Sequence, residues 1–290
     1  MSALARADSG EILVSGEFPF TRTDFRTVAS LLYGMAGITL PDSKATLVYS
    51  RLAKRLRVLG LSSFDAYCEL VASDQGMEER QSMLAALTTN VTRFFREPHH
   101  FDHLRSRVLE PLAAAVRAGR RLRIWSAGCS TGQEPYTIAL TVLDVIPEAA
   151  TLDVKILATD IDPNVVATAR QAVYADELIE GVPPALRNRW LDRRPDGAWA
   201  VKSAARDLVS PKVLNLMERW PMKGPFDVIF CRNVVIYFDE QTQERMWSRF
   251  APLLSPGGQL YVGHSERAGY PGSILVSDGL TAYRAPGVLS

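Results

Sequence analysis

The sequence of 290 residues lacks most of the features that place a chain in a special class. It has no run of about 18 apolar residues, the length of a membrane span, and it does not begin with a basic stretch followed by an apolar one, so we expect a cytoplasmic protein. Its three cysteines, Cys68, Cys129 and Cys231, form no C-x-x-C pair, which argues against disulfides and zinc and predicts buried thiols. A net charge of +1 argues against a surface built for nucleic acid.

The hydrophobic pattern changes along the chain and predicts two domains after a short tail. Residues 1–20 mix Gly, Ser, Asp and Glu without periodicity, which predicts a mobile tail. Residues 21–88 repeat apolar side chains at helical spacing, with Asp24 as an expected cap, and predict an all-α domain. From residue 89, and most clearly after residue 120, strand and helix patterns alternate, which predicts an α/β domain (89–290) with a mostly parallel sheet.

Short segments within the α/β part predict its elements. The expected strands are residues 122–126, 154–159, 227–231 and 259–263. Two apolar segments, residues 274–276 and 281–283, flank Asp278-Gly279 and predict a closing antiparallel hairpin. A Pro-Asp-Gly turn at residues 195–197 interrupts the alternation, so we expect a small β insertion at about residues 186–212.

A glycine-bearing turn between the first expected strand and the following helix points to a nucleotide-like ligand. Gly128 and Gly132 stand four residues apart in this turn. Such a turn brings backbone N–H groups close to a ligand at a helix N-terminus. The spacing is neither the G-x-G-x-x-G of dehydrogenases nor a P-loop, which ends in Gly-Lys-Ser/Thr. S-adenosylmethionine (SAM) is therefore the ligand that we predict.

Two acids follow the second expected strand and have different expected roles. Asp160 stands directly at the strand end, where a carboxylate can accept hydrogen bonds from both hydroxyls of a ribose. Asp162 precedes Pro163, the arrangement typical of a helix N-cap. We therefore assign Asp160 to the cofactor and Asp162 to the structure.

Five blocks of sequence resemble the CheR family of chemotaxis receptor methyltransferases. They are residues 90–97 (NVTRFFRE), 127–136 (AGCSTGQEPY), 158–162 (ATDID), 230–238 (FCRNVVIYF) and 263–266 (GHSE). The N-terminal part is also similar, at residues 36–38 and 51–56. One departure is Gln133, where many relatives have a first glutamate before the one corresponding to Glu134.

The resemblance implies a fold, an activity and a partner. The fold is an all-α N-terminal domain followed by a Rossmann-like SAM-dependent methyltransferase sheet with a small β-subdomain insertion. The activity is transfer of the methyl group of SAM to glutamate side chains of chemoreceptor cytoplasmic helices, which gives glutamyl methyl esters and S-adenosylhomocysteine. The partner is therefore a methyl-accepting chemoreceptor, with no nucleic acid and no insertion into the membrane. We expect a monomer.

The resemblance also implies which residues form the site. The expected cofactor-binding residues are Asn90, Thr92, Arg96, Gly128, Gly132, Glu134, Asp160, Asn215, Leu216, Arg232 and Asn233. Arg96 carries a guanidinium fork that matches a carboxylate, and with Tyr237 it is an expected catalytic residue. Tyr237 can shape the site or hydrogen-bond the substrate, and a core tyrosine is the alternative.

One helix in the N-terminal part carries four cations. Leu52, Leu56 and Leu59 repeat at helical spacing and should face the bundle, so the cations should point largely outward. The cations are Arg51, Lys54, Arg55 and Arg57. They form either a solvated basic face or a docking surface for a receptor rich in glutamates, and we favour docking.

The expected β insertion is relevant to how the enzyme binds its receptor. In some family members the β subdomain binds a short peptide at the receptor's C-terminus, and those members share a Gly-x-Gly-x-x-x-Gly stretch in it. Here only Gly197 is present. We therefore predict a methyltransferase that does not depend on a C-terminal pentapeptide tether.

Two other functions are alternatives to receptor methylation. A nucleic-acid methyltransferase would use the same sheet and would bind with strong salt dependence. A non-catalytic SAM-binding module is a second alternative, against which Asp160 and Asn233 count. Three neighbouring histidines, His99, His100 and His103, lack a completing ligand and are expected at a solvated helix start, so we predict no metal. We expect His264 to be structural.

Overall fold

The computed structural model describes residues 10–270 and 272–288. It divides into two compact units. One extends to Thr89 and takes in Tyr237–Asp239, and the other comprises Asn90–Ile236 and the chain from Glu240 on. No helix in the described part of the chain is long and apolar enough to cross a membrane.

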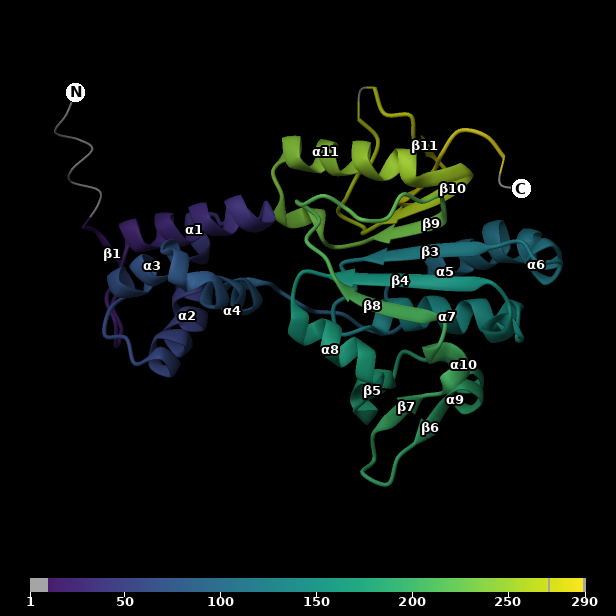
Figure 1. Ribbon diagram of the computed structural model, residues 1–290, viewed down its shortest axis with the longest axis horizontal. Coiled ribbons are helices and arrows are strands. Elements are labelled where there is room, and N and C mark those ends of the chain that lie inside the picture. Colours follow the sequence, from purple (N-terminus) through teal and green to yellow (C-terminus); the bar gives the residue numbers. More distant parts are fainter. Residues whose placement is uncertain (1–9, 271, 289–290) are drawn as a thin grey trace. The chain divides into compact units, whose positions relative to one another are not determined.

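In its described residues, the first unit consists of four helices and a short β ribbon (Figure 1). The helices are α1 (Arg22–Ala36), α2 (Ala45–Leu59), α3 (Phe64–Ala72) and α4 (Met77–Leu87), with 3-10 turns η1 (Asp42–Lys44) and η2 (Asp74–Gly76). Strands β1 (Ile12–Val14) and β2 (Phe20–Thr21) pair antiparallel. Phe20, Phe25, Phe64, Leu52 and Leu56 are buried in its core. The expected all-α N-terminal domain is confirmed.

The ribbon was not expected from the sequence. Residues 1–9 of the expected tail lie outside the described residues, but part of residues 10–20 forms β1 and begins β2. Phe18 and Phe20 are buried there, and burial of these rings anchors the segment to the helices. Strands of two and three residues are too short to show a period-2 pattern, which is why the segment resembled a tail.

Helix α1 begins differently from the expectation. Thr21, not Asp24, is its N-cap. The Thr21 hydroxyl oxygen accepts from the Asp24 N–H at 3.2 Å, and the Asp24 carboxylate accepts from the Thr21 N–H at 2.8 Å. Asp24 is thus the third helical residue of a capping box, where it satisfies a backbone donor that precedes the helix.

A seven-stranded sheet forms the centre of the second unit (Figure 1). Its order is β11-β12-β10-β9-β3-β4-β8. The strands are β3 (Leu122–Ala127), β4 (Val154–Asp160), β8 (Val209–Val213), β9 (Phe226–Cys231), β10 (Leu254–Val262), β11 (Val276–Ser277) and β12 (Ala282–Arg284). The five from β10 to β8 are parallel, and β12 pairs antiparallel with both of its neighbours, β10 and β11. The predicted α/β class and closing hairpin are confirmed.

Helices cover both faces of this sheet. The helices in the described part of this unit are α5 (His99–His103), α6 (Glu110–Arg117), α7 (Gln133–Val145), α8 (Pro163–Gln171), α9 (Pro184–Trp190), α10 (Ser203–Arg206) and α11 (Glu240–Phe250), with the π-helical turn η3 (Leu104–Leu109) between α5 and α6. Ile124 packs in one cluster with Ile138 of α7, whereas the ring of the next residue, Trp125, lies 5.1 Å from the Phe250 ring of α11. Because successive strand side chains point to opposite faces, α7 and α11 lie on opposite faces.

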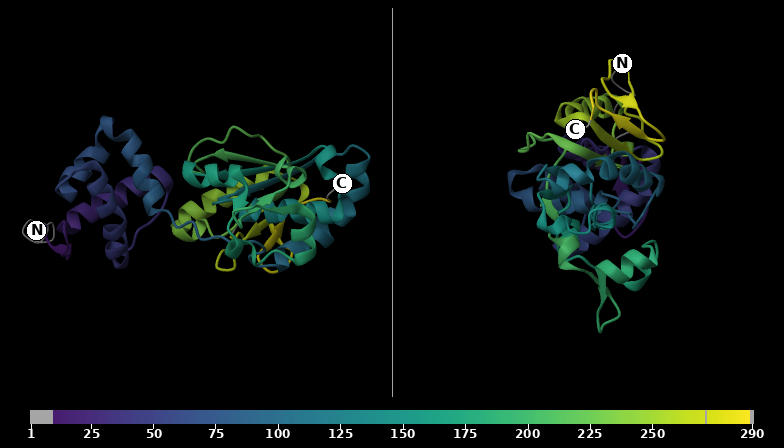
Figure 2. Two further views of the ribbon diagram at one scale, coloured as in Figure 1. Left: turned by 90° about the horizontal axis from the view of Figure 1, so that it is seen from below. Right: turned by 90° about the vertical axis from the view of Figure 1, so that its right-hand side faces the viewer.

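A second, three-stranded sheet in this unit corresponds to the expected insertion. It consists of β5 (Val173–Tyr174), β6 (Leu191–Arg193) and β7 (Trp199–Val201), and its β6–β7 hairpin projects from the unit (Figures 1 and 2). Gly197 has φ 85° in the hairpin turn, as a Pro-Asp-Gly turn requires. The expected range of 186–212 needs correction at both ends, because β5 precedes it and β8 is a strand of the main sheet that pairs with β4.

The parallel strands place their carboxyl ends at one edge of the main sheet. After β3 the chain moves outward to β4 and β8, and it then returns to β9 on the other side of β3. The strand order therefore reverses between β3 and β9. In open α/β sheets, ligands bind outside the carboxyl ends at such a point. The segments that follow β3, β4, β8 and β9 are thus the place to look for an active site.

Candidate active site

The turn after β3 is closely packed and requires its glycines. Gly128 has φ 83° and Gly132 has φ 99°, in the left-handed region. A Cβ on Gly128 would lie 2.2 Å from Val234 Cγ2, and a Cβ on Gly132 would lie 2.6 Å from the Tyr174 hydroxyl. The N–H groups of Gly128 and Cys129 both donate to the Thr159 carbonyl at 2.8 Å. The turn is thereby fixed to the end of β4, beside Asp160.

Asp160 is buried at the end of β4 and directly contacts the glycine turn. Its carboxylate accepts from the Ser130 N–H at 2.8 Å and from the Asp162 N–H at 3.1 Å. Burial raises the pKa of this carboxyl, although the backbone donors partly oppose the shift. Asp162 caps α8, since its side chain accepts from the Asn164 N–H at 2.8 Å. The structural role predicted for Asp162 is confirmed.

The segment before α5 is tied to the same turn. The Asn90 carbonyl accepts from the Ser130 hydroxyl at 2.9 Å, and the Asn90 side-chain amide donates to Asp162 at 3.1 Å. The Arg96 guanidinium donates to the Val91 carbonyl at 3.1 Å. Asn90 therefore lies with Asp160 and the glycine turn, as the sequence led us to expect.

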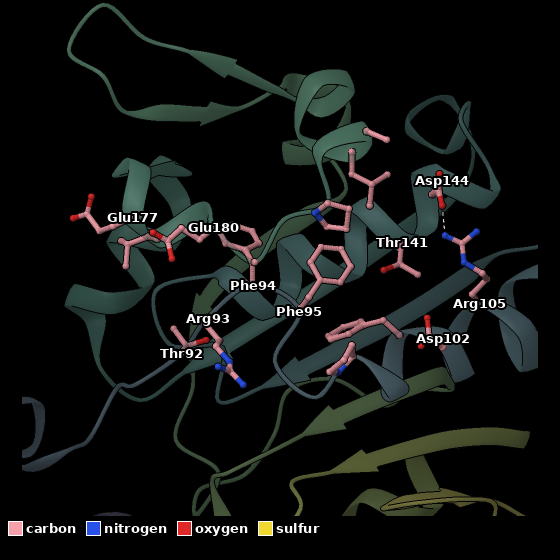
Figure 3. Close-up of a pocket in the computed structure, with 17 residues that line it drawn as sticks. Thr92, Arg93, Phe94, Phe95, Asp102, Arg105, Thr141, Asp144, Glu177 and Glu180 are labelled. Carbon is pink, nitrogen blue, oxygen red and sulfur yellow. Dashed lines mark hydrogen bonds and ion pairs between the residues drawn. The ribbon is translucent and has the colours of Figure 1, made fainter.

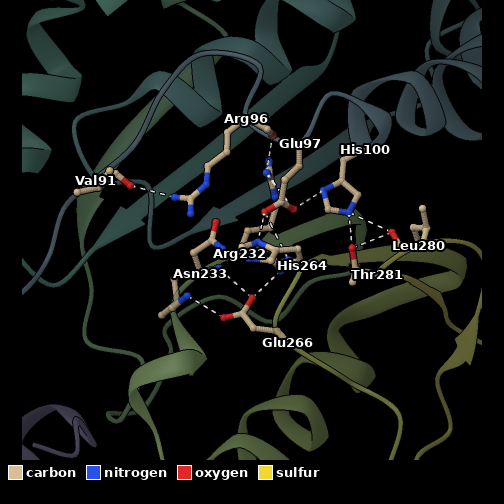
Figure 4. Close-up of polar contacts among 12 residues, drawn as sticks. Val91, Arg96, Glu97, His100, Arg232, Asn233, His264, Glu266, Leu280 and Thr281 are labelled. Carbon is tan, nitrogen blue, oxygen red and sulfur yellow. Dashed lines mark hydrogen bonds and ion pairs between the residues drawn. The ribbon is translucent and has the colours of Figure 1, made fainter.

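Arg232, at the end of β9, is the centre of a buried ionic network (Figure 4). Its guanidinium donates to the Arg96 carbonyl at 2.5 Å and lies 3.4 Å from carboxylate oxygens of Glu97 and Glu134. Glu134, at the start of α7, also accepts from the Ser126 hydroxyl at 2.7 Å. The side chain of Arg232 is almost fully buried, so it links three segments of the site.

Burial and the positive charge of Arg232 have opposite effects on the pKa values of Glu134 and Glu97, and the net shift differs between the two. Burial raises the pKa of Glu134, and Arg232 only partly opposes the shift. Burial would also raise the pKa of Glu97, but Arg232 together with a hydrogen bond from His264 outweighs it and lowers that pKa.

Histidines around Glu97 differ from the expectation of a solvated helix start. His100 is fully buried: Nε2 lies 2.8 Å from the Thr281 hydroxyl and 3.2 Å from the Leu280 carbonyl, and Nδ1 lies 3.5 Å from Glu97 (Figure 4). Burial, with Arg232 adding to it, lowers the pKa of His100 to about 3, so its ring is neutral. The prediction was wrong for this residue because helical spacing does not reveal contacts with a distant segment.

Three of these groups meet a distance criterion for metal ligands. Potential ligand atoms of Glu97, His99 and His100 lie within 4.8 Å of one another. Glu97 and His100 are, however, already engaged with Arg232, His264 and Thr281. The cluster is therefore accounted for by the network within the unit.

Glu266 follows β10 and binds four backbone N–H groups. One carboxylate oxygen accepts from Asn233 at 2.8 Å and Gly263 at 2.5 Å, and the other accepts from Val234 and Val235 at 2.9 Å each (Figure 4). Burial raises the pKa of this carboxyl against the effect of the four donors. Neither Glu266 nor Glu97 was among the predicted site residues. Both glutamates lie in the sequence blocks that resemble the CheR family, and this was the signal by which they could have been identified.

Asn215 and Leu216 follow β8 at the same edge. The Leu214 N–H donates to the Asp160 carbonyl at 2.9 Å, which holds this segment beside β4. Asn215 turns its side chain back to accept from the Met217 N–H at 2.9 Å, and Leu216 is buried. Asn233 follows β9 with φ 59°, in the left-handed region. Asn90, Asp160, Asn215, Arg232 and Asn233 therefore all belong to segments at the carboxyl edge of this sheet.

Other predicted residues lie elsewhere. Thr92 lines a pocket of about 730 Å³ between the start of α5, α7 and the segment before α9 (Figure 3). Its floor includes Phe95 and Phe101, and its side includes an ion pair between Arg105 and Asp144. The glycine turn, Asp160 and Asn233 are not among its lining residues, so this pocket is distinct from the site built above.

Tyr237 belongs to the first unit. Its carbonyl accepts from both the N–H and the hydroxyl of Thr39, at 2.8 Å and 2.9 Å. Its expected part in catalysis remains a prediction.

The expectation that the cations of α2 point largely outward needs correction for Arg51 and Arg55. Arg51 donates to the carbonyls of the last turn of α4, including Thr88 at 2.8 Å. Arg55 pairs through two hydrogen bonds with the buried Glu79, at 3.0 Å and 2.6 Å. These partners lie on another helix and could not be read from the spacing on α2. Lys54 and Arg57 are exposed, and Arg57 pairs with the exposed Glu17.

All three cysteines are free and buried, as predicted.

The residues at the sheet edge fit SAM. Two glycines let the turn after β3 pack closely at the carboxyl edge of the sheet, and a buried carboxylate stands at the second strand end, where ribose hydroxyls would be accepted. Groups of this kind are suited to binding a nucleoside.

Comparisons with known proteins agree with this geometry. Residues 90–272 match the family model described as CheR methyltransferase, SAM binding domain, and residues 23–88 match the one described as CheR methyltransferase, all-alpha domain. A probable chemotaxis protein methyltransferase of Rhizobium etli is 54% identical over 88% of this chain and 96% of that protein.

Two further relatives carry similar names. Chemotaxis protein methyltransferase 2 of Pseudomonas aeruginosa is 44% identical over 92% of this chain and 94% of its own length. The chemotaxis protein methyltransferase of Escherichia coli is 41% identical over 89% of each chain. The resemblance first seen in five short blocks is confirmed across both units. The chain therefore belongs to the CheR family of methyltransferases, with S-adenosylmethionine as its cofactor.

Proposed function

We propose that this methyltransferase acts on glutamate side chains in the cytoplasmic helices of chemoreceptors and forms glutamyl methyl esters. The observation that carries the proposal is the high identity, across nearly the whole chain, to proteins named chemotaxis protein methyltransferases. A cytoplasmic location follows from this substrate, and we propose that the enzyme acts as a monomer.

The chemistry needs little from the protein beyond binding and orientation. When bound, SAM supplies a methyl group activated by a positively charged sulfur. A glutamate carboxylate has a pKa of about 4.3, so at neutral pH it is already ionised and requires no general base. The chain therefore needs to hold the two reactants in line, a contribution that can reach roughly 7 kcal/mol or more.

The carboxyl edge of the sheet supplies groups for holding the cofactor. We assign Asp160 to the ribose hydroxyls and the glycine turn to close approach of the backbone. Within the described residues the Arg96 guanidinium donates to a backbone carbonyl, and its five N–H groups exceed that one bond, which leaves donors for a carboxylate of the cofactor. Asn233 is assigned to the place where the glutamate enters. A site that excludes water would favour the reaction, since the two opposite charges disappear as the methyl group moves.

The two exposed cations of α2 provide a test of receptor docking. Replacing both, Lys54→Glu with Arg57→Glu, should lower kcat/KM for a receptor fragment by about tenfold because it places negative charge against a glutamate-rich helix. Affinity for SAM should stay within about twofold. Initial methylation rates at several salt concentrations measure the effect, and Arg121→Glu, an exposed cation of the other unit, is the control. Equal losses in both variants would contradict docking at α2.

Independence from a receptor tether is a separate part of the proposal. The β6–β7 turn contains Gly197 alone, where tethered relatives have three glycines. We expect a receptor fragment to be methylated with the same kcat/KM, within about twofold, whether or not its C-terminal pentapeptide is present. Methyl transfer from labelled SAM to the two fragments measures this. A loss of tenfold or more on deletion would show that the tether is used.

A further inference from the structure

We propose that Glu266 is a positioning residue for the methyl-transfer reaction, because it holds the turn after β9 in the conformation that presents Asn233. The inference deepens the function proposed above, from which the role of Asn233 is taken. Glu266 itself is nearly fully buried and need not touch cofactor or substrate.

The number and placement of its hydrogen bonds set Glu266 apart. Three successive N–H groups, those of Asn233, Val234 and Val235, donate to it at 2.8–2.9 Å. A fourth, from Gly263, donates at 2.5 Å. A carboxylate has two oxygens that accept about four hydrogen bonds, so this group is saturated by the backbone it holds. Only a carboxylate can bind all four donors in this way.

The turn held by Glu266 has a conformation that needs support. Asn233 lies at φ 59°, in the left-handed region, which asparagine adopts more often than most other non-glycine residues but which is still uncommon. Such conformations persist when surrounding contacts over-determine them, and they concentrate at functional sites. Here the hydrogen bonds from three consecutive N–H groups to Glu266 are the contacts that hold the conformation. They leave the Asn233 side chain at the carboxyl end of β9, beside the point where the strand order reverses.

The same turn also reaches the glycine loop. Val234 lies so close to Gly128 that a Cβ on that glycine would be 2.2 Å from Val234 Cγ2. A shift of the turn would therefore move Val234 against the loop that packs on Asp160. On the other side, a Cβ on Gly263 would lie 2.5 Å from Asn233 Nδ2 and 2.8 Å from the Glu266 carboxylate. Glu266 thus fixes two neighbours of the cofactor site at once.

Glu266→Gln is the most direct test. Glutamine offers one acceptor oxygen and an NH₂ group, so two of the four N–H groups would face another donor. We expect kcat/KM for methyl transfer to a receptor fragment to fall roughly 10- to 100-fold, by analogy with the range seen when residues that orient metal ligands are removed. The Kd of SAM, measured by titration calorimetry on the folded protein, should rise by about tenfold. Glu266→Asp keeps the charge and should lose less of both.

A matched control separates positioning from general stability. Asp227 is a buried carboxylate at the opposite end of β9, where it accepts from the Arg123 N–H and from the Arg120 guanidinium at 2.8 Å each. Asp227→Asn should lower the melting temperature, while the folded protein keeps the SAM Kd and kcat of the wild type within about twofold. If Glu266→Gln behaves in this way too, the proposal is overturned and Glu266 is only structural.

Two further results keep the test decisive. If Glu266→Gln does not fold, the variants Glu266→Asp and Gly263→Ala replace it, because both change the same turn. The proposal would be overturned if both variants had the kcat and the SAM Kd of the wild type. The wild-type protein is titrated and assayed alongside. Failure of the wild type to methylate a receptor fragment would count against the proposed function, whereas an active wild type with fully active variants would count against Glu266 alone.

Discussion

Replacing Asp160 by alanine should weaken the binding of SAM about 100-fold or more. The substitution removes a buried carboxylate expected to accept two ribose hydroxyls, and hydrogen bonds to a charged group contribute roughly 1.5–3 kcal/mol each. It also releases the Ser130 and Asp162 N–H groups, so the glycine turn loses one of its anchors. Isothermal titration with SAM and with S-adenosylhomocysteine measures the loss, which should be similar for both ligands because both carry the ribose.

The control for this experiment is a surface aspartate near the other end of the sheet. Asp153 is half-exposed and pairs with Arg123, just before β4 begins. Asp153→Ala should bind SAM as the wild type does. An Asp160→Ala protein that is folded and binds SAM with unchanged affinity would show that the ribose is held elsewhere.

Removing the cation from the buried network should have the largest effect on stability. Arg232→Met would leave Glu97 and Glu134 without the guanidinium that lies 3.4 Å from each. Breaking a buried ion pair in this way usually costs 3–5 kcal/mol, since an uncompensated charge remains buried. We expect a loss of about that size in the free energy of unfolding, measured by urea denaturation of the unliganded protein.

A surface pair provides the comparison for Arg232. Arg117 and Glu148 form an exposed ion pair on the second unit, and exposed pairs contribute about 0–1 kcal/mol. Arg117→Met should therefore change the unfolding free energy far less than Arg232→Met does. Equal, small changes for Arg232→Met and Arg117→Met would mean that the network is not a stabilising feature of the site.

Local sequence patterns predicted the parts of the site that depend on neighbours in the chain. The glycine turn and the capping of α8 by Asp162 are examples, because turn geometry and helix capping involve residues only a few positions apart. Strand β8 was harder to recognise. Its sequence, VSPKV, contains Pro and Lys, which suit an edge strand but weaken the strand pattern.

Contacts between distant segments account for what the sequence did not reveal. Glu266 binds N–H groups about 30 residues away, and His100 contacts Thr281 across 181 positions. For Arg51 and Arg55, spacing on the helix indicated which face they occupy but not that the end of α4 and Glu79 lie within reach. Such partners follow from packing, so they emerge only with the fold.

The most direct test of the central claim is the chemical nature and position of the transferred methyl group. The enzyme is incubated with SAM and a chemoreceptor cytoplasmic fragment, and the modified fragment is mapped by peptide mass spectrometry before and after mild alkaline treatment. We predict methyl groups on glutamate side chains that alkali removes, as expected for esters, and no transfer by the Asp160→Ala protein. Methylation that resists alkali, or that falls on residues other than glutamate, would contradict the account.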